Sequence, residues 1–189
     1  GEALLRSAFF LVRPGQEPLE PSALATLLEE QAAVGLRYVA VFDPDPEAER
    51  KLSEVLANAR RSLPGLYDAA LPPEGRLRFC ASLEEAVAGA QWIQESVPER
   101  LELKHRVLTR IQAVMANDAV IGSSTSGFKP SELGAGVPRP GQVLVAHPFN
   151  PVYLLPVVEV VPHASAADDL VTGALQTLRS IGMMPLRLR

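Results

Sequence analysis

The stretch Trp92–Ser123, WIQESVPERLELKHRVLTRIQAVMANDAVIGS, predicts a strand, a charged amphipathic helix and a second strand. We expect the first strand at 91–94, the helix at 98–115 and the second strand at 119–121. The helix has its apolar residues spaced along one face, whereas both strands are short apolar runs. A strand, a helix and a strand in this order are typical of a parallel sheet with helical crossovers.

The same alternation extends outward to both ends of the chain. The predicted strands are apolar throughout, as expected when helices cover both faces of a sheet. We therefore predict an α/β fold with a doubly wound, mostly parallel sheet. The further strands are expected at 8–12, 38–42, 77–79, 143–146, 157–161 and 184–188, and the further helices at 21–34, 45–63, 129–133 and 168–181, with a short helix after the capping-box sequence Ser82–Glu85.

The composition excludes several classes of protein. The chain has 189 residues, is 47% hydrophobic and carries a formal net charge of −4, which argues against disorder and against nucleic-acid or anionic-membrane partners. The single cysteine, Cys80, excludes an internal disulfide framework and a cysteine-based zinc site, and we expect no metal site. No apolar run reaches the roughly 18 residues of a membrane span, so we expect a soluble, cytoplasmic domain.

Two aspartates follow the predicted strand 38–42. In a dinucleotide-binding fold, an acidic residue at the end of the second strand hydrogen-bonds the adenosine ribose. Asp43 occupies that place and would repel a 2′-phosphate, which favours NAD over NADP. The alternative is that Asp43 and Asp45 only begin the following helix.

A run of hydroxyl side chains, Ser123–Ser126, follows the strand at 119–121. These hydroxyls could bind an oxygen of a ligand at the carboxyl end of the strand. The alternative is that they cap the short helix that follows.

A histidine and a carboxylate lie twelve residues apart, on consecutive predicted strands. His147 ends the strand at 143–146, and Glu159 lies within the apolar run 157–161, where an unpartnered carboxylate is costly. An imidazole held by a carboxylate is a usual general-base arrangement. A purely structural His–Glu pair is the alternative.

Four segments together resemble the NAD-binding domain of the L-3-hydroxyacyl-CoA dehydrogenase superfamily, and within it the bacterial L-carnitine dehydrogenases. They are FDPDPEAER from Phe42, WIQESVPERLELK from Trp92, SSTSGFKPSEL from Ser123 and AHPFNPVYLLPVVEVV from Ala146. The similarity covers about residues 38–189. The last segment is the most specific, although the L-gulonate dehydrogenase branch shares its His-Pro-x-Asn-Pro frame.

The resemblance implies a role for each matching residue. The catalytic base is His147, oriented by Glu159, while Ser126 and Asn150 hold the substrate oxygen. The implied cofactor contacts are Asp43, Ser96, Glu99, Lys104 and Ser124. Because aromatic faces bind quaternary ammonium groups, Phe149 and Tyr153 are candidates for the trimethylammonium group of carnitine.

The implied activity is oxidation of L-carnitine at its 3-hydroxyl carbon to 3-dehydrocarnitine, with NAD as the hydride acceptor. L-gulonate and a 3-hydroxyacyl-CoA are the alternative substrates, and no basic pocket for the phosphates of CoA is evident. An alternative of another class is a degenerate Rossmann-like module without turnover.

The segment after the first predicted strand departs from the family. The fingerprint G-x-G-x-x-G brings the backbone close to the pyrophosphate. Residues 12–21 read VRPGQEPLEP, with one glycine, three prolines that lack an N–H, and two glutamates. We therefore expect NAD to bind more weakly than in a relative with an intact fingerprint.

The resemblance also predicts the domain organisation. We expect residues 1–189 to form one Rossmann-like NAD-binding domain. The helical domain that follows in the family would lie outside this chain, and it usually closes the substrate site and forms a homodimer.

Overall fold

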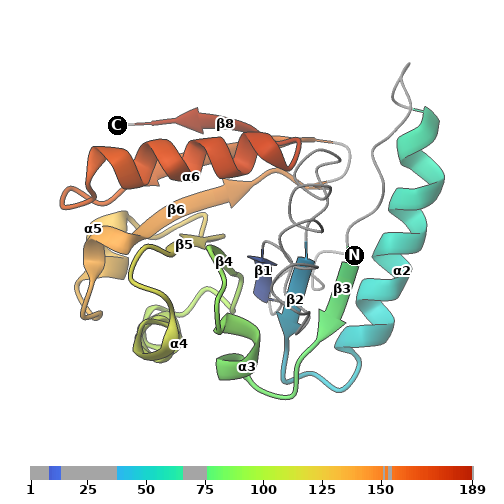
Figure 1. The fold of residues 1–189 in the computed structure, drawn as a ribbon, viewed down its shortest axis with the longest axis horizontal. Coiled ribbons are helices and arrows are strands. Elements are labelled where there is room, and N and C mark those ends of the chain that lie inside the picture. The colour runs from blue at the N-terminus through green and yellow to red at the C-terminus, as the bar shows by residue number, and fades with distance from the viewer. Residues whose placement is uncertain (1–8, 14–37, 66–75, 151, 153–154, 189) are drawn as a thin grey trace, which may run out of the picture.

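The computed structural model describes residues 9–13, 38–65, 76–150, 152 and 155–188. Within these ranges eight strands form one sheet in the order β3-β2-β1-β4-β5-β6-β7-β8, with helices packed against it (Figure 1). The chain therefore has the Rossmann-like α/β fold that the sequence predicts. The strands are β1 (Phe9–Arg13), β2 (Tyr38–Phe42), β3 (Arg76–Phe79), β4 (Trp92–Glu95), β5 (Val120–Ser123), β6 (Val143–Pro148), β7 (Val157–Pro162) and β8 (Met184–Arg187).

The described helices lie close to the positions that periodicity predicts. They are α2 (Ala48–Ser62), α3 (Leu83–Val87), α4 (Leu101–Val114), α5 (Pro130–Gly134) and α6 (Asp168–Ser180), with 3₁₀ turns η1 (Leu63–Gly65) and η2 (Pro140–Gln142). The predicted cap of α3 is present, because the Ser82 hydroxyl accepts from the Glu85 amide at 3.1 Å. The helix expected at 21–34 lies outside the described residues.

The two faces of the sheet carry separate apolar cores. On one face, α3, α4 and α5 pack against strand residues such as Ile93 and Ile121. On the other face, α6 packs against Trp92, Val120 and Leu144. Successive strand residues alternate between these cores, as the pleat of a strand requires. The consequence is that the central strands β4, β5 and β6 are largely buried on both sides, which explains their apolar residues, whereas the edge strand β8 is mostly exposed.

The first strand is an exception within the mostly parallel sheet. β1 runs antiparallel to both of its neighbours, β2 and β4. Phe9 pairs with Phe42 and Arg13 pairs with Tyr38, so the chain leaves β1 at the amino end of β2. An apolar run specifies burial and does not specify direction, which is why the sequence did not reveal this reversal.

Five strands share one direction and bring their carboxyl ends to the same edge of the sheet. The pairs β2·β3, β4·β5 and β5·β6 are parallel, and β1 is antiparallel to both β2 and β4. This shared edge, at the ends of β2, β3, β4, β5 and β6, is called the carboxyl edge below. Strand β7 turns back antiparallel to β6, and β8 runs parallel to β7.

None of the helices in the described ranges has both the length and the apolar character needed to cross a membrane.

Candidate active site at the carboxyl edge

The predicted site residues follow the ends of β2, β4, β5 and β6. Asp43 follows β2, Ser96 follows β4, and Ser124 and Ser126 follow β5, while His147 lies near the end of β6. In open α/β sheets, ligands bind outside the carboxyl ends of the strands. The fold therefore brings residues from four separate segments to the edge where a ligand is expected.

His147 and Glu159 form a cross-strand pair. They lie directly opposite each other in the antiparallel ladder of β6 and β7. The Nδ1 atom of His147 lies 3.3 Å from Oε2 of Glu159, and both side chains are about one third exposed. When Nδ1–H donates to the carboxylate, Nε2 carries the lone pair and can accept a proton. The pair thus has the geometry of a base and its orienting carboxylate.

The residues expected to contact substrate lie on the loops after β5 and β6 or outside the described ranges. The ring of Phe149 lies 5.8 Å from that of His147, tilted by 55°, and Phe149 is partly exposed. Ser126 and Asn150 are exposed on the loops after β5 and β6. Tyr153 lies outside the described residues, so the structure does not test its predicted contact.

Asp43 has one carboxylate oxygen engaged by the protein backbone. Its Oδ1 accepts from the Asp45 amide at 2.9 Å. Burial raises the pKa of Asp43, and the charge of Asp45 adds to this, while the hydrogen bond from the Asp45 amide and the charge of Lys51 oppose it. Asp43 therefore shapes the turn before α2 and lies at the carboxyl edge, and its contact with a ribose stays a prediction.

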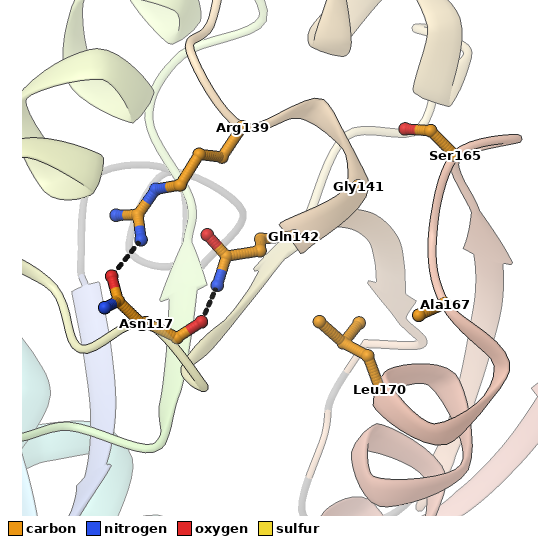
Figure 2. Close-up of a pocket in the computed structure, with 7 residues that line it drawn as sticks. All are labelled: Asn117, Arg139, Gly141, Gln142, Ser165, Ala167 and Leu170. Atoms are coloured by element: carbon orange, nitrogen blue, oxygen red, sulfur yellow. Dashed lines mark hydrogen bonds between the residues drawn. The ribbon is translucent and has the colours of Figure 1, made fainter.

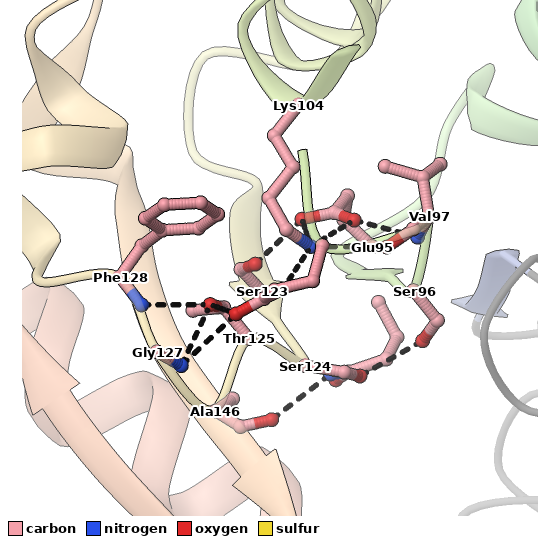
Figure 3. A network of polar contacts seen from close by, with 12 residues as sticks. Glu95, Ser96, Val97, Lys104, Ser123, Ser124, Thr125, Gly127, Phe128 and Ala146 are labelled. Atoms are coloured by element: carbon pink, nitrogen blue, oxygen red, sulfur yellow. Dashed lines mark hydrogen bonds and ion pairs between the residues drawn. The ribbon is translucent and has the colours of Figure 1, made fainter. Parts of the chain in front are cut away.

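Lys104 is buried in a polar cluster that the sequence did not reveal (Figure 3). Its ammonium lies 3.0 Å from Oε1 of Glu95, and the two side chains are 1% and 0% exposed. The ammonium also contacts the Val97 carbonyl at 3.1 Å, and Oε2 of Glu95 accepts from the Ser123 hydroxyl. The ammonium of Lys104 thus donates to protein groups. We infer that Lys104 affects a cofactor through the residues around it.

Glu99 binds the loop that follows β5. It accepts from the Thr125 hydroxyl and from the Gly127 amide, and it lies 3.4 Å from Lys104. Burial raises the pKa of Glu99, but these hydrogen bonds and the Lys104 charge outweigh it and hold that pKa below the usual glutamate value. The ionised Glu99 carboxylate therefore stabilises the folded domain at neutral pH, and this contribution is lost as the pH falls through the lowered pKa of Glu99.

Two polar residues of this region were missed in the sequence. Glu95 ends an apolar strand, and the argument used for Glu159, that a buried carboxylate needs a partner, applies equally to it. Gln94 lies in the same strand, and its amide contacts Ser124 and the Ala146 carbonyl. A single neutral amide in an apolar run gave no comparable signal.

A cavity of about 410 Å³ lies away from these residues (Figure 2). Arg139 and Gln142 line it from the η2 turn, and Leu170 lines it from α6. The Arg139 guanidinium donates to Oδ1 of Asn117 at 3.1 Å, so it is held by the protein. Because this cavity lies at the amino ends of β5 and β6, it is separate from the carboxyl edge.

The described residues contain no group of three or more His, Cys, Asp or Glu side chains arranged to hold a metal ion.

The comparison with known families identifies a matching family. A family model described as "3-hydroxyacyl-CoA dehydrogenase, NAD binding domain" matches residues 29–189. The chain belongs to this family. The match begins beyond β1, so it leaves out the strand that runs antiparallel to both of its neighbours.

Curated relatives within the family are named for carnitine. The L-carnitine dehydrogenase/betainyl-CoA thioesterase of Ruegeria pomeroyi is 61% identical over 151 residues, which is 80% of this chain and 31% of that protein. The L-carnitine dehydrogenase of Pseudomonas aeruginosa is 49% identical over 160 residues, or 83% of this chain and 49% of that protein. This chain therefore spans about a third to a half of the length of these relatives.

Two solved structures of similar fold carry the name dehydrogenase. A 5-formyl-3-hydroxy-2-methylpyridine 4-carboxylic acid 5-dehydrogenase, described as an NAD⁺-dependent dismutase, is 30% identical with a TM-score of 0.72, covering 84% of this chain and 52% of that one. The 3-hydroxybutyryl-CoA dehydrogenase of Escherichia coli is 26% identical with a TM-score of 0.69, covering 84% of this chain and 34% of that one.

Removing the charge of Lys104 is expected to destabilise the domain. The Lys104→Met variant leaves the buried Glu95 carboxylate without its cation, which should lower the free energy of unfolding by about 3–5 kcal/mol in urea denaturation. The double variant Glu95→Gln/Lys104→Met should recover most of this loss, because the uncompensated charge is gone.

Lys129→Met, at an exposed position, is the matched control and should change the free energy of unfolding by less than about 0.5 kcal/mol. A Lys104→Met variant as stable as this control would contradict the assigned ion pair.

Proposed function

We propose that this chain is the NAD-binding catalytic part of an L-carnitine dehydrogenase. The observation that carries the proposal is the His147–Glu159 pair, with Nδ1 3.3 Å from the carboxylate at the carboxyl edge. Support also comes from relatives of 49–61% identity that are named L-carnitine dehydrogenase. The reaction is oxidation of the 3-hydroxyl of L-carnitine to 3-dehydrocarnitine.

His147 acts as the general base in this proposal. Its Nε2 takes the proton of the 3-hydroxyl, and the positive charge that develops on the imidazole is stabilised by Glu159 through Nδ1–H. Bound NAD supplies the acceptor for the hydride that leaves C3. Glu159 also fixes the orientation of the His147 ring. The single contact between Nδ1 and the carboxylate therefore controls both the position of the base and its ability to take a proton.

The remaining substrate contacts are proposed from the family resemblance. Ser126 and Asn150, exposed at the ends of β5 and β6, would hold the substrate oxygen as the alkoxide becomes a carbonyl. Phe149, beside the His147 ring, would offer an aromatic face to the trimethylammonium group, and Tyr153 is proposed for the same role from the resemblance.

The carboxyl edge fits the ribose parts of NAD better than its phosphates. Asp43 has a carboxylate oxygen left for a ribose hydroxyl, Ser96 and Ser124 offer hydroxyls, and Glu99 anchors the loop beside them. The end of β1 lies at the opposite edge of the sheet, whereas the phosphate-binding turn of a dinucleotide-binding fold follows a strand that ends at the carboxyl edge. Lys104 is assigned a positioning role, because its donors are occupied by protein groups.

The properties of the whole protein are also proposals. We propose a cytoplasmic enzyme that forms a homodimer through a helical domain outside this chain. L-gulonate and a 3-hydroxyacyl-CoA are the alternative substrates of the same site.

A second candidate function is a Rossmann-like module without turnover. The reversed direction of β1 favours it, because that strand normally leads into the phosphate-binding turn. The intact His147–Glu159 pair disfavours it, since a module without chemistry has no need of an oriented base.

Substrate oxidation tests the proposal directly. The whole protein that carries this chain, supplied with millimolar NAD, is expected to form NADH with L-carnitine, followed by absorbance at 340 nm. L-gulonate and 3-hydroxybutyryl-CoA are the matched comparisons, with kcat/KM expected at least tenfold lower. A preference for either of them would reassign the substrate, and no turnover with any of the three would favour the module.

The affinity of the chain for NADH tests whether the altered sequence after β1 weakens cofactor binding. Calorimetric titration of the chain with NADH is expected to give a dissociation constant above the micromolar range, because the glycine turn is missing. NADPH should bind more weakly still, since Asp43 repels its 2′-phosphate. Micromolar binding of NADH would show that another part of the chain holds the pyrophosphate.

A further inference from the structure

A side-chain amide crosses one strand of the sheet at the carboxyl edge. Gln94 lies on β4 and pairs with Gly122 on β5. Its Nε2 nevertheless donates at 3.0 Å to the carbonyl of Ala146, which lies on β6, beyond β5. Ala146 immediately precedes the proposed base, His147.

Gly122 makes this crossing possible. A Cβ atom at that position would lie 2.5 Å from a ring carbon of Trp92, 2.8 Å from the Cβ of Ala146 and 3.1 Å from Oε1 of Gln94. Any larger residue would therefore push aside the side chains that meet over β5. The glycine is explained by this close approach on the face of the sheet that α6 covers.

Every hydrogen-bonding atom of the Gln94 amide has a partner. Oε1 accepts from the indole N–H of Trp92 at 3.1 Å, and the two hydrogens of Nε2 go to the Ser124 hydroxyl oxygen at 2.8 Å and to the Ala146 carbonyl. This fixes which end of the amide is oxygen, because Trp92 can only donate and the Ala146 carbonyl can only accept.

The fixed amide donates to the serine pair and does not take up either of its hydroxyl hydrogens. Ser124 and Ser96 share one hydrogen bond, with their oxygens 2.8 Å apart (Figure 3). The two hydroxyls have two hydrogens, of which their mutual bond uses one. Because Gln94 already donates to Ser124, the pair has one O–H left that can donate to an acceptor oxygen of a ligand.

We infer that Gln94 is a positioning residue, which leaves one hydroxyl hydrogen of the Ser96–Ser124 pair free to donate to a cofactor oxygen and ties β4 to the carbonyl before His147. The inference rests on the proposed function for the identity of the ligand. The geometry of Trp92, Gln94 and Ala146 carries the rest. Gln94 acts through these neighbours, so replacing it should weaken cofactor binding without removing a contact to the cofactor.

Two substitutions of Gln94 by residues of similar size distinguish its hydrogen-bonding role from a role in packing. Gln94→Leu removes all three hydrogen bonds. Gln94→Glu keeps the acceptor for the Trp92 indole, but its ionised carboxylate has no hydrogen for Ser124 or Ala146. Both should raise the NADH dissociation constant about fivefold to tenfold relative to the wild-type chain, the range expected for losing about one hydrogen bond. If packing alone mattered, Gln94→Glu would bind NADH as the wild type does.

A second readout needs no ligand. Trp92 is the chain's single tryptophan, so one indole N–H signal in a ¹⁵N–¹H spectrum reports its bond to Gln94. That signal should move and exchange faster in Gln94→Leu, while Gln94→Glu should retain it. The backbone amide signal of His147, which shares a peptide group with the Ala146 carbonyl, should move in both variants.

The matched control is Gln112→Leu. Gln112 is also buried and also bridges two backbone groups, the N–H and carbonyl of Arg139, but it does so far from the carboxyl edge. It should change neither the NADH affinity nor the two signals.

The inference is overturned if Gln94→Leu leaves both signals unchanged, or if Gln94→Glu binds NADH with wild-type affinity. A wild-type chain that fails to bind NADH would refute the proposed cofactor, while the two signals would still decide whether Gln94 holds Ala146 and Trp92.

Discussion

The ammonium of Lys104 and the carboxylate of Glu95 are both withdrawn from solvent, 3.0 Å apart, where β4 ends and α4 begins. Two buried charges are tolerated only when each is compensated and hydrogen-bonded. Here the Ser123 hydroxyl, the Val97 backbone and Glu99 complete the shell, so the end of β4, the first turn of α4 and the end of β5 are fixed together. The loops that carry the candidate site residues start from these fixed ends.

A second polar cluster lies on the opposite face of the same strands. Gln94 and Ser124 belong to it, and Gly122 leaves the space in which they meet Ala146. The pleat sends Gln94 and Glu95 to different faces, so two neighbouring residues organise both sides of the carboxyl edge. We interpret the carboxyl edge as a ligand-binding site that a polar cluster stabilises on each face of the sheet. The His147–Glu159 pair lies where β6 meets β7.

Much of this architecture could be predicted from the sequence because apolar periodicity and capping residues act locally. Strand β2, helix α4 and the cap at Ser82 follow from such local signals. The direction of β1 could not be predicted, since pairing with β2 and β4 is a long-range choice that a five-residue apolar run does not encode. The burial of Lys104 was missed for a related reason, because its partner Glu95 lies on another element and only the folded chain brings them together.

The His147 and Glu159 pattern predicted either a general base with its carboxylate or a structural pair, and the family resemblance supplied the catalytic roles. In the β6·β7 register these two residues, twelve apart in the chain, lie directly opposite each other. Which substrate they serve depends on the relatives and on chemistry beyond this chain. The structure itself contributes the orientation of the imidazole, with Nδ1 toward Glu159.

Measuring kcat for L-carnitine oxidation in His147→Gln, Glu159→Gln and the double variant of the whole protein tests the central claim most directly. If the two residues act as one unit, His147→Gln lowers kcat by about 10²–10⁴-fold, Glu159→Gln lowers it less, and the double variant is no slower than His147→Gln alone. Full activity in His147→Gln, or losses that multiply in the double variant, would contradict the claim.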